Sequence, residues 1–163
     1  MNVSGWTESR YWNFIRGVLR SGFKRYPNKY KALASSKRGR GEYECNSCKG
    51  VFKAKEVSVD HISPCGSIKS YEDVATFAET LFCSPDNLQV LCKECHYNKT
   101  MKDRGHSMLD IEVIQFKKHS ATKQRIILSN LGVTDVGKNQ AERVEQYKQI
   151  IELDYGTNNA ALL

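Results

Sequence analysis

Two Cys-x-x-Cys pairs constrain this 163-residue chain more than any other feature of its sequence. The first pair is Cys45 and Cys48, the second is Cys92 and Cys95, and 43 residues separate the pairs. Two such pairs match a closed tetrahedral zinc site, in which four thiolates leave no position open for a substrate. The sequence therefore predicts one structural Zn²⁺ that ties two distant parts of the chain together.

The cysteines and the first residues of the chain indicate the cellular compartment in which the protein is expected. The 6 cysteines could instead form disulfides in a secreted protein. However, residues 1–6 lack the apolar core of a signal peptide, which favours the cytoplasm, where thiols stay reduced. Cys65 and Cys83 fall outside the paired pattern and are interpreted as free or core thiols. No apolar run approaches membrane-spanning length, so no membrane association is expected.

Positive charge is concentrated ahead of the first cysteine. Residues 1–44 hold ten Lys/Arg and three Glu, whereas residues 45–163 balance fifteen Lys/Arg against fifteen Asp/Glu. A localised basic segment indicates a polyanionic partner rather than solubility alone, and its interleaved aromatic residues favour nucleic acid. The candidate DNA contacts are Arg16, Arg20, Lys24, Arg25, Lys37, Arg38 and Arg40, with Lys99 further along the chain.

The segment up to the first cysteine pair predicts helices, a loop and a knuckle. A helix capped by Thr7 is expected to end near Gly22, and a second short helix follows it. Residues 35–41 are interpreted as a flexible basic loop. Residues 43–52 resemble a zinc knuckle, in which Gly50 is expected to take the positive φ angle that the turn requires.

Two short strands and several helices are predicted for the rest of the chain. Alternation over residues 56–62 is typical of a strand, and residues 88–91 predict a second one. A helix capped by Ser70 is expected in the connection between these strands. Further helices are predicted at residues 92–102, 109–118 and 121–131, and from residue 139 onwards.

Several polar residues remain once the zinc ligands are assigned. Consecutive strand residues point to opposite faces, so Asp60 and His61 can serve one site only where the strand ends, as Ser63-Pro64 would allow. His96 follows Cys95 on a helix, and its side chain therefore points about 100° away from the zinc ligand. The zinc would bring His96 near Asp60. A carboxylate and an imidazole suit a divalent metal, and a further imidazole suits a general base.

Two stretches of sequence resemble the motif of the HNH endonucleases, which belong to the ββα-metal superfamily. They are Val59-Asp-His-Ile-Ser-Pro64 and Asn87-Leu-Gln-Val-Leu-Cys-Lys-Glu-Cys-His-Tyr-Asn-Lys99, and the resemblance is to the four-cysteine zinc branch. The aromatic and basic N-terminal segment resembles that of small phage-encoded HNH proteins. The resemblance implies an α+β fold with a treble-clef-like zinc site. Its parts would be a basic helical extension at residues 1–42, the ββα-metal core at residues 43–105 and a helical extension at residues 106–163.

The resemblance also implies a role for each polar residue of the motif. Asp60 and His96 would bind one catalytic divalent cation, Mg²⁺ or Mn²⁺. His61 would be the general base that activates water, and Asn87 would fix the connecting loop and orient His61. The implied activity is metal-dependent hydrolysis of DNA, by nicking or double-strand cutting, in phage homing, packaging or DNA degradation.

Other functions stay open at this point. A non-catalytic zinc-finger DNA-binding protein could keep the same fold, although it would not need all of Asp60, His61, Asn87 and His96. A nuclease that acts on RNA is a further alternative function. The partners considered are double-stranded DNA, a phage terminase and a second copy of the chain, in the host cytoplasm if a phage encodes the protein.

Overall fold

The computed structural model describes residues 5–160 and divides the chain into two compact units. The first unit is Met1–Tyr97 and the second is Asn98–Leu163, so the boundary between them falls within one helix. The three-part division expected from the sequence stays a prediction. Within the described residues, every helix is too short or too polar to cross a lipid bilayer.

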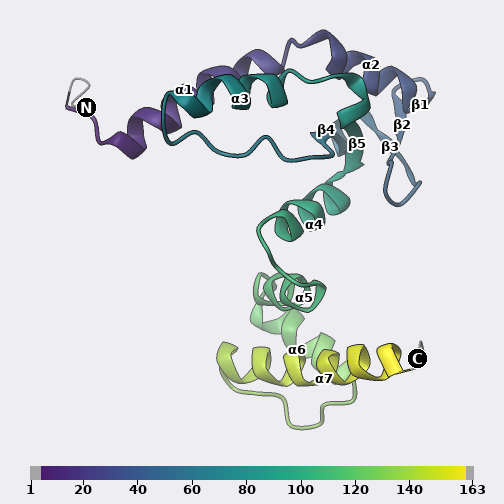
Figure 1. The fold of residues 1–163 in the computed structure, drawn as a ribbon. Helices are drawn as coiled ribbons and strands as arrows, with labels where there is room; N and C mark the ends of the chain where they lie inside the picture. The colour runs from purple at the N-terminus through teal and green to yellow at the C-terminus, as the bar shows by residue number, and fades with distance from the viewer. Residues whose placement is uncertain (1–4, 161–163) are drawn as a thin grey trace. The chain divides into compact units, whose positions relative to one another are not determined.

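The first unit mixes helices with two small sheets, as expected of an α+β fold (Figure 1). Its helical elements are α1 (Glu8–Phe23), α2 (Pro27–Ser35), the turns η1 (Ala54–Glu56) and η2 (Pro85–Asn87), α3 (Glu72–Leu81) and the start of α4 (Lys93–Asp103). Its strands are β1 (Lys37–Gly39), β2 (Glu42–Glu44), β3 (Val51–Lys53), β4 (Val57–His61) and β5 (Leu88–Cys92).

Both sheets of the first unit are antiparallel. One sheet has the order β1-β2-β3 and the other pairs β4 with β5. In the β4–β5 pair, Val57 lies opposite Cys92 and His61 lies opposite Leu88. Helix α4 follows β5 directly, so the second cysteine pair spans the junction between a strand and a helix. The strands predicted at residues 56–62 and 88–91 are therefore confirmed, and the hairpin they form leads straight into the helix that carries His96.

The prediction of a flexible loop at residues 35–41 is wrong. Lys37–Gly39 is strand β1, which pairs with Glu42–Glu44 across a turn where Gly41 has a φ of 71°. Arg38 also donates to the Glu44 carboxylate at 2.8 Å. Basic residues were interpreted as a solvated loop, but pairing with β2 gives their backbone groups hydrogen-bond partners and so orders the segment.

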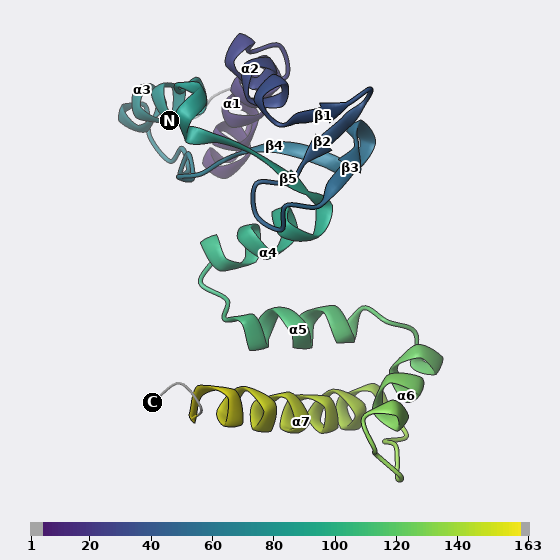
Figure 2. The ribbon, with the colours of Figure 1, turned by 90° about the vertical axis from the view of Figure 1, so that its right-hand side faces the viewer.

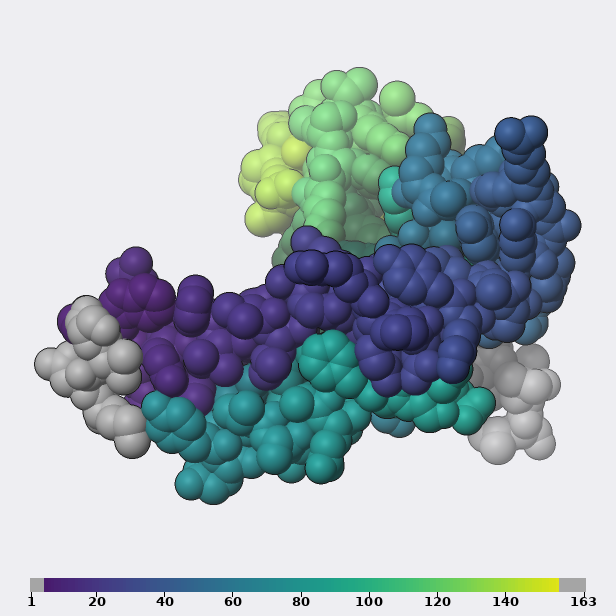
Figure 3. Space-filling view, turned by 90° about the horizontal axis from the view of Figure 1, so that it is seen from above, coloured from purple at the N-terminus to yellow at the C-terminus, as the bar shows by residue number. Residues whose placement is uncertain are grey.

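Helix α1 packs along α3 through an apolar core. Trp12, Ile68, Phe77 and Leu81 form this core, and the α1 surface runs beside the teal surface of α3 in Figure 3. Thr7 caps α1 as predicted, because its Oγ1 accepts the N–H of Arg10 at 3.3 Å.

The predicted Ser70 cap of α3 is wrong. The helix starts after Tyr71, which makes no side-chain capping bond. The Asp73 carboxylate instead accepts the backbone N–H groups of Lys69 and Ser70. The Asp73 side chain in the first turn of α3 thus fixes the segment that enters the helix, whereas a serine cap would have bound N–H groups of the first turn itself.

The second unit is helical (Figure 2). Its core contains Phe116, Leu128 and Val144, and the Phe116 ring stacks on Tyr147 with a centroid distance of 4.2 Å. Figure 2 shows α5 and α7 side by side, with α6 at the end where α5 finishes. Besides the end of α4, the helices of this unit are α5 (Met108–Lys117), α6 (Ala121–Asn130) and α7 (Gln140–Ala160).

A buried polar pair fixes the turn between α5 and α6. Gln124 is fully buried and its Nε2 donates to the carbonyl oxygens of Phe116 and His119, at 3.2 and 3.1 Å. Arg143, which is 4% exposed, donates from Nε to Gln124 Oε1 at 2.9 Å and from Nη1 to the Gly137 carbonyl. A buried guanidinium is tolerated when hydrogen bonds satisfy it, so Gln124 and Arg143 depend on each other.

Replacing Gln124 with leucine should destabilise the protein by about 1–3 kcal/mol, because it leaves carbonyl groups and part of the Arg143 guanidinium buried without partners. Chemical unfolding followed by circular dichroism measures this free energy. Gln149→Leu is the matched control, since Gln149 lies exposed on α7. Equal stabilities of the two variants would show that the Gln124–Arg143 pair does not hold the unit.

Candidate active site

The four paired cysteines converge on one point. Their sulfur atoms all lie within 4.8 Å of one another, and Cys48 Sγ lies 4.0 Å from Cys92 Sγ. Four sulfurs placed about 2.3 Å from a tetrahedral zinc ion would be about 3.8 Å apart. The cluster therefore has the spacing and the donor chemistry of a structural zinc site, as the sequence predicted.

The thiols of this cluster are poised for a cation. Burial raises the pKa of Cys45, but backbone N–H groups of Cys48, Cys92 and Ser47 outweigh burial and lower that pKa to about 7. Burial raises the pKa of Cys95 to about 12, and the neighbouring sulfurs add to the effect. Cys45 therefore loses its proton more readily than Cys95, and a divalent cation among the sulfurs would favour the thiolate form of Cys95 as well.

The knuckle takes its positive φ angle at Lys49 (φ 61°), so the assignment to Gly50 is wrong. Gly50 is needed for a different reason, since a Cβ there would come within 2.9 Å of the Phe52 ring. Asn46 ties the knuckle to β5, because it exchanges hydrogen bonds with Val90 through its side chain (3.0 Å) and its N–H (2.8 Å). The zinc site is thus joined to the β4–β5 hairpin by backbone bonds as well as by sulfur.

Asp60 and His96 meet beside the zinc cluster. Asp60 lies on β4 opposite Gln89, and His96 lies on the first turn of α4, directly after Cys95. The distance from Asp60 Oδ1 to His96 Nε2 is 3.7 Å, and both side chains are partly exposed. Two ligands of one octahedral cation lie between about 3 and 4 Å apart. The pair could therefore hold a divalent ion, with water and substrate oxygens as further ligands.

His61 lies on the other face of β4, as strand alternation requires. The residue is 8% exposed, and its ring packs on Phe23 of α1 with a centroid distance of 4.8 Å. Its Nε2 is 2.9 Å from the carbonyl oxygen of Leu81, at the end of α3. Because a carbonyl can only accept, Nε2 must carry the proton, and the neutral ring then has its lone pair on Nδ1.

Asn87 holds the chain immediately after His61. Its Oδ1 accepts the N–H of Ser63 at 2.9 Å, and its backbone carbonyl accepts the N–H of Ile62 at 2.9 Å. The residue sits at the end of η2, just before β5. These contacts agree with the loop-fixing part of its predicted role, whereas its effect on His61 stays a prediction.

Two partners of His61 were missed in the sequence. They are the Phe23 ring and the Leu81 carbonyl oxygen, neither of which was assigned to the site from the sequence. The Leu81 contact is made by a backbone carbonyl, which every residue possesses, so no side-chain pattern could have indicated it.

The predicted DNA contacts differ in their surroundings. Arg16 donates to Asn13, and the Arg20 guanidinium lies 5.9 Å from the Phe77 ring. Arg38 pairs with Glu44, and Lys99 pairs with Asp103 four residues later. All of these DNA contacts stay predictions, and the members with exposed side chains are Arg20, Lys24, Arg25, Lys37, Arg38 and Arg40.

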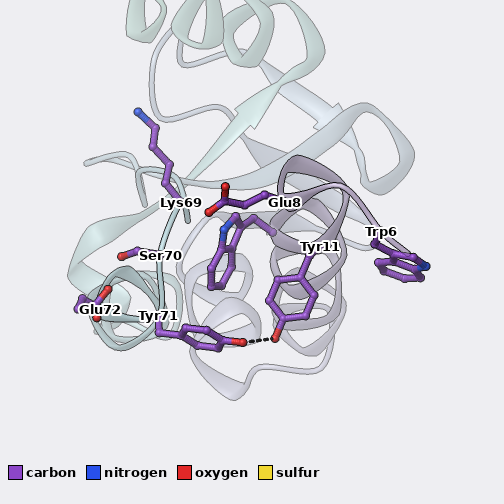
Figure 4. A pocket seen from close by; sticks show the side chains of 8 residues that line it. Trp6, Glu8, Tyr11, Lys69, Ser70, Tyr71 and Glu72 are labelled. Carbon is purple, nitrogen blue, oxygen red and sulfur yellow. Dashed lines mark hydrogen bonds between the residues drawn. The ribbon is translucent and has the colours of Figure 1, made fainter. Parts of the chain in front are cut away.

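A separate cavity of about 270 Å³ lies where α1 begins. Figure 4 shows Tyr11 and Tyr71 turned toward each other, with their hydroxyl oxygens 3.0 Å apart. Trp12 also lines this cavity, and its Nε1 is the one buried side-chain polar atom without a hydrogen bond in the described part of the chain. The lining residues do not include Asp60, His61 or His96, so the cavity is distinct from the Asp60–His96 pair.

One relative of known family name is similar to this chain in sequence. The chain is 32% identical over 97 residues to a protein of Lactococcus phage SK1 named as a probable HNH endonuclease, covering 60% of this chain and 77% of the relative. The chain belongs to the HNH endonuclease family. No family model and no solved structure matches it. Membership of the HNH family fits a zinc-type cysteine cluster beside paired aspartate and histidine side chains.

Proposed function

We propose that this HNH family member is a metal-dependent DNA endonuclease whose ββα-metal core consists of β4, β5 and α4. The observation that supports this proposal is the Asp60–His96 pair, whose Oδ1 and Nε2 atoms are 3.7 Å apart. The two residues lie on a hairpin and a helix that the four cysteines join. A purely structural zinc module would not need a carboxylate and an imidazole facing each other beside a closed cysteine site. The relative's name supports an endonuclease activity and a phage setting. Double-stranded DNA as substrate and the host cytoplasm as compartment are part of the proposal.

His61, the last residue of β4, would act as the general base, and its Nδ1 would reach the water beside the Asp60–His96 pair past the end of the strand. The Leu81 carbonyl holds the Nε2 proton, which leaves Nδ1 to take a proton from the attacking water. Packing against Phe23 limits rotation of the ring, so the base would be oriented before the substrate arrives. Asn87 would support this orientation by pinning Ile62 and Ser63.

Asp60 and His96 would hold one divalent cation, Mg²⁺ or Mn²⁺. When bound, such an ion stabilises the charge that develops on the phosphoryl oxygens and on the leaving 3′ oxygen. The expected products carry 5′-phosphate and 3′-hydroxyl ends. One site cuts one strand, so a single chain is expected to nick duplex DNA, and double-strand cutting would need a second copy or a second event. A terminase partner has no support in the described fold or in the relative's name.

A plasmid-nicking assay with Mg²⁺ or Mn²⁺ tests the proposal. Asp60→Ala and His96→Ala should each slow nicking by about 100-fold or more, since a metal supplies several kcal/mol of transition-state stabilisation. Asp135→Ala is the matched control, because Asp135 is an exposed aspartate of the second unit.

The same assay decides between the proposal and its alternatives. Wild-type protein that binds DNA but does not nick it with either metal would be a zinc-containing DNA-binding module. An RNA strand of the same sequence, incubated in parallel, separates a DNA-directed enzyme from an RNA-directed one.

A further inference from the structure

The net positive charge of the second unit is concentrated in α6 and in the residues on either side of it. Residues 117–134 contain Lys117, Lys118, Lys123 and Arg125 and no Asp or Glu. The rest of that unit, residues 98–116 and 135–163, has six Lys/Arg against eight Asp/Glu. The near-neutral C-terminal half of the chain therefore contains a basic surface that an average charge conceals.

Helix α6 exposes this charge on its outer face. Its buried side consists of Gln124 and Leu128, while Lys123 and Arg125 are exposed. Neither Lys123 nor Arg125 forms an ion pair with any residue that the structure describes. Ile126 is 55% exposed and lies among polar neighbours, so the face is not an apolar patch of the kind that buries against protein.

A short turn and several hydrogen bonds fix the orientation of α6 relative to α5. Three residues separate α5 from α6, which is the short turn of a helix-turn-helix unit. Gln124 ties α6 to the last carbonyls of α5, and the Ser120 hydroxyl caps the helix at the N–H of Lys123. A left-handed Gly132 (φ 87°) ends it. A basic helix held this rigidly is suited to contact with a partner of defined geometry.

We infer that α6 and its preceding turn form a second DNA-binding surface, which places α6 in the major groove of duplex DNA. The groove is about 12 Å wide and admits one α-helix. Lys123 and Arg125 would contact phosphates, and the exposed side chains of Thr122, Ile126 and Asn130 would face base edges. The inference rests on the proposed function for the identity of the partner.

Fluorescence anisotropy of a labelled duplex tests this inference with the full-length, zinc-loaded protein. No Mg²⁺ or Mn²⁺ is added, so binding is measured without cleavage. Lys123→Gln combined with Arg125→Gln should weaken binding roughly 10- to 30-fold at physiological salt, and should reduce the slope of log K against log salt by about 2. Each single variant should reduce the slope by about 1.

Lys148→Gln is the control, because it removes one positive charge from α7 in the same unit. It should leave the salt slope unchanged, and circular dichroism should show all variants folded. The inference is overturned if Lys123→Gln and Arg125→Gln bind DNA with wild-type affinity, or if Lys148→Gln weakens binding as much as either of those variants. It is also overturned if Lys123→Gln and Arg125→Gln change self-association of the protein instead of DNA binding. Because the experiment measures DNA binding and not cleavage, its result tests this inference independently of the nuclease assay.

Discussion

Replacing His61 with alanine should reduce the rate of plasmid nicking by about 10²- to 10⁴-fold, the usual contribution of a general base. The expectation follows from the Leu81 carbonyl, which fixes the Nε2 proton and leaves Nδ1 as the proton acceptor. The Asp60–His96 pair is untouched by this change, so affinity for the catalytic metal should persist. Initial rates of nicking at saturating Mg²⁺, measured per zinc-loaded protein, give the comparison.

Two further measurements separate a base from a structural residue. His106→Ala is the control, since His106 lies in the second unit, outside the proposed machinery. Added imidazole should restore part of the activity of His61→Ala, because a small base can enter the space that the ring leaves. A variant that keeps wild-type activity, or one whose loss is matched by a loss of folded protein, would remove His61 from the mechanism.

Loss of the zinc site should have the largest effect on stability. In Cys92→Ser one thiolate of the four-sulfur cluster is lost, and structural zinc contributes about 10–16 kcal/mol in small zinc modules. We expect this variant to purify with less than one zinc per chain and to lose the cooperative unfolding of the first unit. Elemental analysis and thermal unfolding measure the two effects.

Cys83→Ser is the matched control for this change. Cys83 is a half-buried cysteine outside the cluster, where its backbone carbonyl accepts the hydroxyl of Tyr26 at 2.9 Å. The backbone bond survives the substitution, so zinc content and stability should stay close to wild type. Equal zinc content in Cys92→Ser and Cys83→Ser would contradict the four-cysteine assignment.

Some elements of the fold were predicted correctly from the sequence, and others were not. Helices and strands with strong periodicity, such as α1 and β4, were confirmed because their apolar spacing is set locally. Residues 35–41 were assigned wrongly, since their strand pairing depends on β2 and on the turn at Gly41. The Gly50 error has a similar origin, because the close approach of the Phe52 ring, rather than the φ angle, restricts that position.

The sequence by itself determined which candidate ligands are available, through the Cys-x-x-Cys spacing and the Asp60-His61 dipeptide. Only the tertiary structure decided how those groups face one another. It set Asp60 against His96 at 3.7 Å and turned His61 to the opposite face, against Phe23 and the Leu81 carbonyl. It also buried Gln124 and Leu128 of α6 and left Lys123 and Arg125 exposed. The physical reason is that distances and hydrogen bonds between segments far apart in the chain arise from long-range packing, which composition and local spacing do not encode.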